Sequence, residues 1–407
     1  MKRFLKIAPV VGVALFGLVF LVSRIDRSEP LTGEQLLLKP GAVEIGSDSA
    51  IDTRPYADFL AKNAQSPTDY VIEKFKAHDL VMLGESHQIQ EDCDFIASLI
   101  EPLYHGAGVR YLGMEIVKEK RNRELEHLLT APAYDSARVT AIFREDYFYW
   151  GFQEYLDILR AVWAFNQTLV KGEAPFRIVG FQPDIDVYRT DCGTLLQKLP
   201  EFPRLLKIED LYAAPLEDLL DKHEKVLVQV GVHHSFLKYR APKVINGKML
   251  GEFTRERMGH ILYSKYGDRV FQIALHPKQE GTERYMEAPT TPVAVLLERL
   301  YDEHGGVPMG FDIVNSPLAM LRDTSGGYFA FQKHATLSDI AQGYIMHQKH
   351  QNLHCVKWVQ NFVNASNLGE LRTYATQRGL IRDGECETPE ELNAKFSELL
   401  RTGIRFP

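Results

Sequence analysis

Acidic, amide and histidine side chains follow several apolar runs of this sequence at the point where each run ends. Carboxylates and imidazoles in such positions serve as general acids and bases, or as ligands of Zn, Mn or Fe ions. If the runs are neighbouring parallel strands, their carboxyl ends lie along one edge and gather these side chains in one crevice. The candidates, in chain order, are Glu85, His87, Glu115, Gln182, Asp184, His233, His234 and Asp312.

Glu85 and His87 are the most informative pair. They are two residues apart, so an extended backbone presents both side chains on one face, and Gly84 permits a close approach just before them. The pair either binds a metal ion or works without metal, with His87 as a general base that its neighbour holds in place. The alternative is structural: Ser86 caps the following helix and Glu85 complements the helix dipole.

Glu115 and His234 are expected to complete this group. Glu115 ends a run with no other charge after Arg110, so it needs a partner such as a metal ion, a protonated histidine or Arg144. A salt bridge at the sheet edge is the structural alternative. Because Gly231-x-x-His234 repeats the pattern Gly84-x-x-His87, His234 is expected to enter the site.

Supporting and substrate-lining residues are also predicted. On an extended chain His233 and His234 point to opposite faces, so His233 is not expected to ligate. His233 and Asp312 are expected to contact the ligating side chains and hold them in place. Tyr149 and Trp150, with Gln182 and Asp184, are expected to line the substrate mouth. Tyr149 and Trp150 belong to an aromatic-rich run, 147–157, and the alternative for this run is a place in the core. The metal ligands in this hypothesis are Glu85, His87, Glu115 and His234.

The elements that must position these residues form an α/β pattern. Six apolar runs predict strands at 80–83, 109–114, 176–181, 226–230, 270–275 and 311–314. Apolar residues at three- and four-residue spacing predict helices at 95–103, 147–169, 251–266 and 293–301. Near-continuous apolar strands separated by helices favour a mostly parallel sheet with helices on both faces.

The remaining segments divide the chain into regions. Residues 54–334 are expected to form the α/β domain, with an excursion outside the sheet from about Arg189 to Lys225. Residues 335–407 read as a helical C-terminal extension without a strand. It includes helices at 337–347 and at 390–400, the latter capped by Thr388-Pro389.

The N-terminus carries a targeting signal. Lys2, Arg3 and Lys6 precede an uncharged apolar run, 7–22, which is a signal peptide or a membrane anchor. Poor small-residue spacing at the end of the run favours an uncleaved anchor over residues 1–29, with 30–53 as a stalk. The basic leading end is then cytoplasmic, which places the domain on the periplasmic or extracellular side.

Composition excludes several partners. The chain has 407 residues, 25% of them charged and 45% hydrophobic, and a formal net charge of −7. Without a basic stretch interleaved with aromatics, nucleic acid is not expected as a partner. No phosphate loop, dinucleotide fingerprint, Gly-x-Ser-x-Gly elbow or His-Glu-x-x-His motif is present, so a nucleotide cofactor is not expected either.

A family resemblance rests on three short motifs. Leu83-Gly84-Glu85-Ser86-His87, Tyr111-Leu112-Gly113-Met114-Glu115 and the later Gly231-x-x-His234 element resemble the erythromycin esterase, ChaN-like and Tiki superfamily. The resemblance implies one of three activities: lactone hydrolysis with a histidine base, metal-dependent peptide hydrolysis, or haem binding. The two-residue spacing of Glu85 and His87 is closer to the ChaN and Tiki form than to the esterases. The sequence also lacks the lipobox cysteine of ChaN lipoproteins.

These observations lead to one main expectation and two alternatives. The main one is a membrane-anchored extracytoplasmic hydrolase of an ester or amide bond in a small molecule or peptide, with water activated by a histidine–glutamate or metal centre. The first alternative is a ChaN-like protein that binds haem or iron without catalysis. The second is a scaffold whose site has decayed.

Overall fold

The computed structural model describes most of the chain. The described residues are 29–30, 33, 37–46, 51–146, 149–184, 208–245, 248–277, 291–323 and 332–403. The apolar run 7–22, predicted as a membrane anchor, lies outside them. In the part of the chain that is described, no helix has both the length and the apolar character to cross a membrane.

A seven-stranded sheet lies at the centre, in the order β10-β12-β9-β3-β6-β4-β5. All its neighbouring strands are parallel except β10, which runs antiparallel to β12. The predicted mostly parallel α/β sheet is therefore confirmed. The strands are β3 (Leu80–Glu85), β4 (Tyr111–Lys118), β5 (Arg177–Gln182), β6 (Val226–Gly231), β9 (Val270–Leu275), β10 (Met309–Asp312) and β12 (Gly343–Met346).

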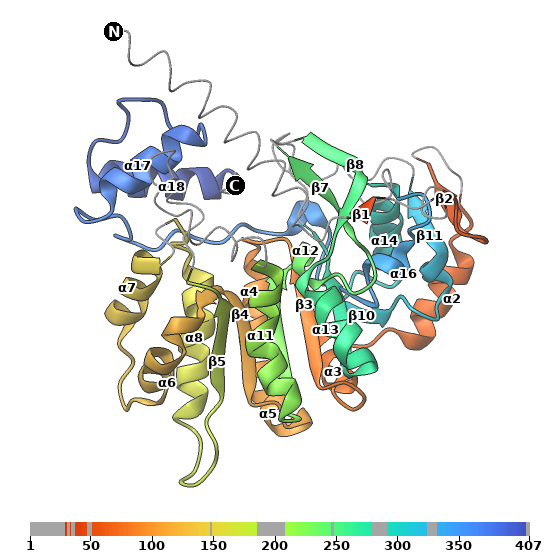
Figure 1. Cartoon of the computed structure of the whole chain (residues 1–407), viewed down its shortest axis with the longest axis horizontal. Coiled ribbons are helices and arrows are strands. Elements are labelled where there is room, and N and C mark those ends of the chain that lie inside the picture. Colours follow the sequence, from red (N-terminus) through yellow and green to blue (C-terminus); the bar gives the residue numbers. More distant parts are fainter. Residues whose placement is uncertain are drawn as a thin grey trace, which may run out of the picture.

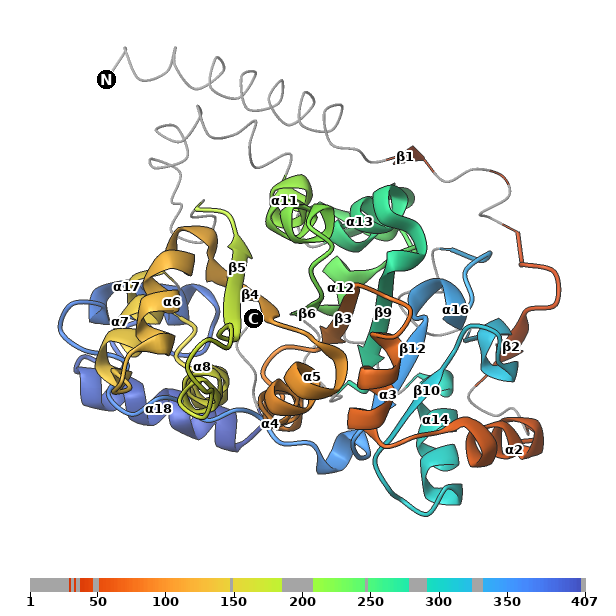
Figure 2. The same ribbon diagram turned by 90° about the horizontal axis from the view of Figure 1, so that it is seen from below.

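Helices cover both faces of the sheet because successive apolar side chains point to opposite faces. In β3, Val81 and Leu83 belong to the core on the α4 and α8 side, and Leu80 and Met82 to the core beneath α11 and α13. The two layers lie on opposite sides of the strands in Figure 2. The first layer contains α3 (Pro67–Lys74), α4 (Gln90–Ser98), α5 (Ile100–Ala107) and α8 (Gln153–Asn166), and the second contains α11 (Ile208–Asp221) and α13 (Met258–Tyr266).

Two further groups of elements extend the sheet at its sides. Beside β5 lie η2 (Glu119–Arg121), α6 (Asn122–Thr130) and α7 (Ser136–Asp146). Beyond β10, a separate apolar cluster forms around α2 (Arg54–Asn63), α14 (Pro292–Glu303), η5 (Pro317–Met320), α16 (Leu337–Ile340) and the two-stranded sheet of β2 (Val43–Ile45) and β11 (Leu321–Asp323).

Short elements follow β6, precede β9 or form a sheet of their own. The helix α12 (Val232–Ser235) follows β6 directly, and η4 (Gly267–Arg269) precedes β9. A small sheet contains β1 (Glu29–Pro30), β7 (Ala241–Ile245) and β8 (Lys248–Arg255). Residues 251–255, predicted as the start of a helix, are therefore strand, and the helix begins only at Met258.

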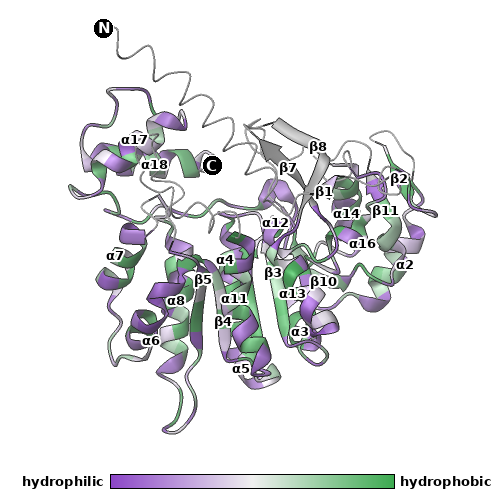
Figure 3. Ribbon diagram, in the orientation of Figure 1, coloured by the Kyte–Doolittle hydropathy of each residue, from purple (hydrophilic) through white to green (hydrophobic). Residues whose placement is uncertain are grey.

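The C-terminal segment returns across the carboxyl edge of the sheet before it forms helices (Figure 1). It contains η6 (His350–Asn352), α17 (Leu368–Gln377) and α18 (Pro389–Arg401). The predicted cap of the last helix is confirmed, since Thr388 and Glu391 form a reciprocal capping box. Figure 3 shows hydrophobic residues on the helix faces and strands that meet in the interior.

Two further predictions for the chain after residue 180 were wrong. Residues 337–347 were expected to form a helix, but only α16 is helical. β12 then enters the main sheet between β9 and β10, because its four residues are apolar enough to be buried on both faces. The excursion predicted for 189–225 is wrong over 208–221, where α11 covers one face of the sheet. Residues 185–207 lie outside the described residues.

Candidate active site

The carboxyl ends of β3, β6 and β4 bring four predicted residues together. The three strands are neighbours, and Glu85 of β3 pairs in register with Gly231 of β6. His87 follows β3, Glu115 lies within β4, and His234 lies on α12. Gly84 allows this arrangement, because a Cβ atom there would lie 2.6 Å from Oγ of Ser235 on α12.

Glu85 is a buried carboxylate that orients His87. Its side chain is 2% exposed, and Oε1 lies 2.7 Å from Nδ1 of His87. The hydroxyl of Tyr155 donates to Oε1 at 2.7 Å, and Nε2 of Gln229 donates to Oε2 at 2.9 Å. A carboxylate in this position favours the imidazole tautomer with its proton on Nδ1, which leaves Nε2 as the unprotonated ring nitrogen.

Burial and hydrogen bonding act on the Glu85 carboxyl in opposite directions. Burial alone would raise its pKa. The hydrogen bond and positive charge of His87, with the hydrogen bonds from Gln229 and Tyr155, outweigh burial and hold the pKa of Glu85 below its ordinary value. Burial also raises the pKa of Tyr155 well above its ordinary value, so the phenol remains a donor.

His234 has a carboxylate partner of its own in Glu209. Nδ1 of His234 lies 2.9 Å from Oε2 of Glu209, on the first turn of α11. Glu209 is also buried, and it accepts hydrogen bonds from Nη1 of Arg257 and from the backbone N–H of Met258, both at 2.9 Å. This second imidazole is therefore also held by a buried carboxylate.

Glu115 lies between the two imidazoles. Nε2 of His87 is 3.7 Å from its Oε2, and Nε2 of His234 is 3.5 Å from its Oε1. The backbone N–H of Gly231 donates to Oε2 at 2.7 Å. The side chains of His87, His234 and Glu115 are 33%, 21% and 12% exposed, so solvent reaches this point although it does not reach Glu85.

Gly231 leaves the space in front of these groups open. A Cβ atom at this position would lie 2.8 Å from Nε2 of His87 and 3.4 Å from Oε2 of Glu115. Any side chain here would occupy the point at which the two histidines and the carboxylate converge. Two oriented bases around a shared carboxylate can accept and return a proton of a bound water.

The aromatic residues predicted for the substrate mouth divide into two roles. The ring of Trp150 meets the His87 ring edge to face, with centroids 5.2 Å apart. Tyr149 instead stacks on Tyr374 of α17 at 5.0 Å. Both residues are buried and belong to the main core, so they pack beside the site in a loop before α8 rather than in the helix predicted from Tyr147.

The other predicted residues lie at increasing distance from the centre. Gln182 is buried at the end of β5 and accepts a hydrogen bond from Tyr212, whose ring contacts His234. Asp184 is 54% exposed and pairs with Lys118 and Lys120, so it belongs to a charged rim.

His233 and Asp312 were both expected to support the ligating residues. His233 lies among the charged groups of the site. Desolvation, followed by the positive charge of Arg257, lowers its pKa to about 3, so it is a neutral neighbour. Asp312 instead accepts a hydrogen bond from Tyr70 and forms an ion pair with Lys74. It lies on β10, three strands from β3, and because β10 runs antiparallel, its end is at the opposite edge of the sheet from the site.

Four residues of the site were missed: Tyr155, Glu209, Gln229 and Arg257. Gln229 had a signal, because it is a lone amide inside an apolar strand and such a group needs a buried partner. Tyr155 belongs to the aromatic-rich run 147–157, and nothing in the sequence distinguished it from core residues. Glu209 and Arg257 are distant from every motif in the sequence. The packing of α11 beside α13 brings Glu209 to His234 and Arg257 to Glu209.

The predicted metal centre does not fit this geometry. Among the described residues, no three His, Cys, Asp or Glu side chains are arranged to hold a metal ion. Both oxygens of Glu85 already accept hydrogen bonds. The proposed chemistry therefore involves no Zn, Mn or Fe ion.

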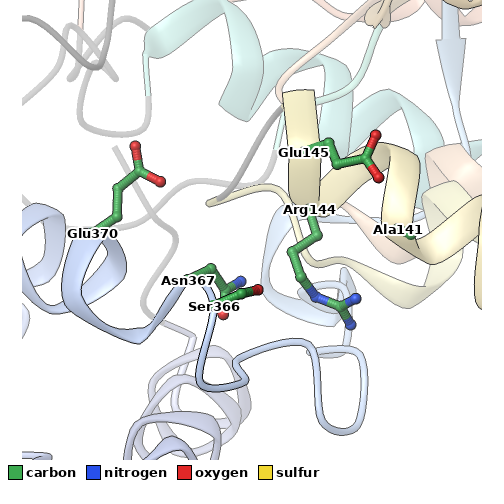
Figure 4. A pocket seen from close by; sticks show the side chains of 6 residues that line it. All are labelled: Ala141, Arg144, Glu145, Ser366, Asn367 and Glu370. Atoms are coloured by element: carbon green, nitrogen blue, oxygen red, sulfur yellow. The ribbon is translucent and has the colours of Figure 1, made fainter.

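A separate pocket lies between α7 and the beginning of α17. Its volume is about 350 Å³, and Figure 4 shows its lining side chains. Arg144, proposed as a partner of Glu115, is one of them. Its guanidinium Nε donates to the backbone carbonyl of Phe362 at 2.8 Å, so it serves the C-terminal segment rather than the histidines. The lining residues are Ala141, Arg144, Glu145, Ser366, Asn367 and Glu370.

The fold is similar to several solved structures. A Bacillus cereus protein matches with a TM-score of 0.49 at 13% identity, over 73% of this chain and 98% of its own. The erythromycin esterase EreC matches at 0.44 and 12%, over 79% and 97%. ChaN of Campylobacter jejuni, described as binding haem cofacially, matches at 0.31 and 14%, over 53% and 86%.

These matches include two of the three branches that the sequence motifs resemble, an erythromycin esterase and a ChaN protein. No family model matches the sequence, and no curated protein matches it significantly. With TM-scores below 0.5 and identities of 11–16%, the structural matches transfer neither activity nor ligand to this chain.

Proposed function

We propose that this protein hydrolyses an ester or amide bond in a small molecule or peptide, with His87 as the general base. The observation that supports this most directly is the orientation of His87. Its Nδ1 is fixed by buried Glu85, and its Nε2 lies at a solvent-reached point opposite Glu115. A base held in one tautomer beside an accessible space is the minimum that water activation requires.

The proposed reaction needs only groups of this chain and one water molecule. Nε2 of His87 takes a proton from the water as its oxygen forms a bond to the substrate carbonyl carbon. The bond from that carbon to the leaving oxygen or nitrogen then breaks, and the leaving atom takes the proton from the imidazolium. Glu85 keeps its charge throughout and stabilises the imidazolium together with Glu115.

His234 is assigned the opposite side of the same space. Anchored by Glu209, it directs Nε2 toward Glu115 from the α12 side. There its Nε2 accepts a hydrogen bond from the attacking water and positions it. Two separately anchored imidazoles distinguish this arrangement from a single structural His–Glu pair.

The test is an assay of the purified full chain against a panel of aryl esters and amides, with and without a chelator. We expect turnover that survives the chelator and falls about 100-fold or more in His87→Ala, since a general base contributes roughly that factor. His105→Ala, which alters an exposed histidine outside the site, is the matched control. Equal background turnover by the wild type and His87→Ala would refute the proposal.

We further propose that residues 1–29 anchor the protein in a membrane with the domain on the periplasmic or extracellular side. The support is the basic leading end and the apolar run 7–22. Cell fractionation of the full chain and of a chain lacking residues 1–29 tests this. Recovery of both in the same soluble fraction would contradict the proposal.

A further inference from the structure

A segment of the C-terminal region crosses the loops that carry His87 and Trp150. Residues 350–359, called the strap here, form two isolated antiparallel bridges, Ile89 with Cys355 and Phe152 with Trp358. Figure 1 shows this part of the chain running along the carboxyl edge of the sheet toward α17. The strap is therefore paired with both loops that border the candidate active site.

Backbone hydrogen bonds flank each bridge. At the first loop, the N–H of Gln90 donates to His354 at 2.9 Å and the N–H of Val356 donates to Gln88 at 3.1 Å. At the second, the N–H of Gln153 donates to Lys357, and the N–H of Val359 donates to Gly151, both at 2.8 Å.

Three carboxylates hold the strap in the same way, and the strap residues they bind are His350, His354 and Lys357. Each carboxylate accepts from the backbone N–H and from the side chain of a single strap residue. Glu298 of α14 binds His350 at 2.7 and 2.6 Å, and Glu91 of α4 binds His354 at 2.9 and 2.6 Å. Glu154 of α8 binds Lys357 at 2.7 and 3.4 Å.

Gln88 links the strap to the His87 anchor. It has a left-handed φ of 70°, which a residue with a side chain adopts only where its surroundings hold it. Its carbonyl accepts from Val356 of the strap, and its N–H donates to the hydroxyl of Tyr155 at 3.0 Å. That same hydroxyl donates to Glu85.

We propose that Glu91 and Glu154 are positioning residues for His87 that act through the strap. They hold residues 354–357, the strap holds Gln88 in its left-handed conformation, and Gln88 fixes the residue before it. The consequence for turnover rests on the proposed function, whereas the effect on the orientation of His87 does not. The C-terminal region is thereby part of the site, although it supplies no group to the reaction.

The experiment reads the position of His87 directly and needs no substrate. Side-chain imidazole NMR signals of the full chain are recorded with labelled histidine, and the His87 signal is assigned by its loss in His87→Ala. Amide hydrogen exchange is measured at Gln90 and Val356. In Glu91→Gln we expect exchange at these amides to become about tenfold faster and the His87 signal to shift or broaden.

Two further variants keep the test decisive. His354→Ala removes the ring that Glu91 binds, at a position 71% exposed, so folding should be retained if Glu91→Gln is too unstable. Lys349→Ala is the matched control, because it breaks an exposed ion pair with Asp302 just before the strap. The control should leave the His87 signal and both amides unchanged.

The His87 signal and the amide exchange together separate a positioning role from a merely structural one. A shifted His87 signal, accompanied in an active preparation by a lower kcat at unchanged KM, supports the proposal. Faster exchange with a His87 signal identical to that of the wild type overturns it, and so does unchanged exchange in a folded variant. If the His87 signal shifts in Glu91→Gln but the wild-type chain hydrolyses none of the substrates, the proposed function alone is contradicted.

Discussion

Gly231 is the residue on which access to the candidate site depends most directly. Its N–H holds Glu115, and the absent side chain leaves Nε2 of His87 exposed. The backbone there has φ −55°, which alanine adopts without strain, so a substitution acts through space alone. This separates the geometry of the site from the stability of the fold.

Gly231→Ala is expected to reduce hydrolysis at least tenfold, because the new methyl group would lie 2.8 Å from the base and displace water or substrate. Esterase rates and the melting temperature are measured together. Gly369→Ala is the control, since a Cβ in that part of α17 meets nothing within 4 Å. Full activity in Gly231→Ala would remove the assignment of this space as the reaction site.

Glu209→Gln tests the anchor of His234. The amide keeps the shape of the side chain but removes the charge that binds Arg257 and the imidazole, so we expect activity to fall about tenfold or more. Steady-state rates are compared with those of Glu217→Gln, which alters an exposed pair on the same helix. Equal losses in both variants would mean that α11, and not the anchor, is responsible.

At the scale of elements, α8 supports the site through one hydroxyl group. Tyr155 donates to buried Glu85 and accepts from Gln88, so α8 fixes both the carboxylate and the loop that follows β3. Because Tyr155 is fully buried, no water replaces a lost bond there.

Tyr155→Phe is therefore expected to lower the free energy of unfolding by about 1.5 to 3 kcal/mol, the usual range for a hydrogen bond to a charged group. It should also raise the pKa of Glu85, since that bond lowers it in the wild type. Urea unfolding measures the first effect. Tyr134→Phe, whose hydroxyl makes only a 3.5 Å contact, should cost less than about 0.5 kcal/mol.

The local pattern of apolar residues predicted strands best where both faces of the strand are buried. The six apolar runs all became strands of the main sheet, because few other structures bury four to six consecutive apolar residues. β12 was missed, since Gly343-Tyr344-Ile345-Met346 is short and lies in a helical pattern. β8 was assigned to a helix for a similar reason: its pairing with β7 overrode the spacing of its apolar residues.

For the whole molecule, neutral histidines make stability depend on pH. Desolvation lowers the pKa of His233 to about 3 and that of His347 to about 4, and it also lowers the pKa of His276. Their ordinary value is near 6.5, so the unfolded chain binds more protons between that pH and the folded values. Stability therefore falls as the pH drops below about 6.5.

We expect the free energy of unfolding to be several kcal/mol lower at pH 5 than at pH 7.5, with about 1 to 2 kcal/mol from His347 alone. Urea titrations at the two pH values measure this. His347→Gln should show a smaller difference than the wild type, while His105→Gln, at an exposed position, should not. An unchanged pH difference in His347→Gln would contradict the assignment.

The sequence alone determined which residues could act as acids, bases or ligands. It also determined that these residues follow the apolar runs that form strands. Glu85, His87, Glu115 and His234 follow from short motifs, because a charged or histidine side chain after an apolar run is a local signal. The α/β class follows equally from local periodicity, since burial on both faces requires long apolar strands.

Only the tertiary structure decided which of those residues meet and what holds them. Glu209 of α11 reaches His234, and Arg257, just before α13, reaches Glu209. The strap reaches the His87 loop from 266 residues further along the chain, as the pairing of Ile89 with Cys355 shows. The direction of β10 carried Asp312 away from the site. Such contacts depend on strand order and helix packing, which are set by the burial of apolar surface over the whole chain. The residues that make these contacts therefore carry no local sequence pattern that predicts them.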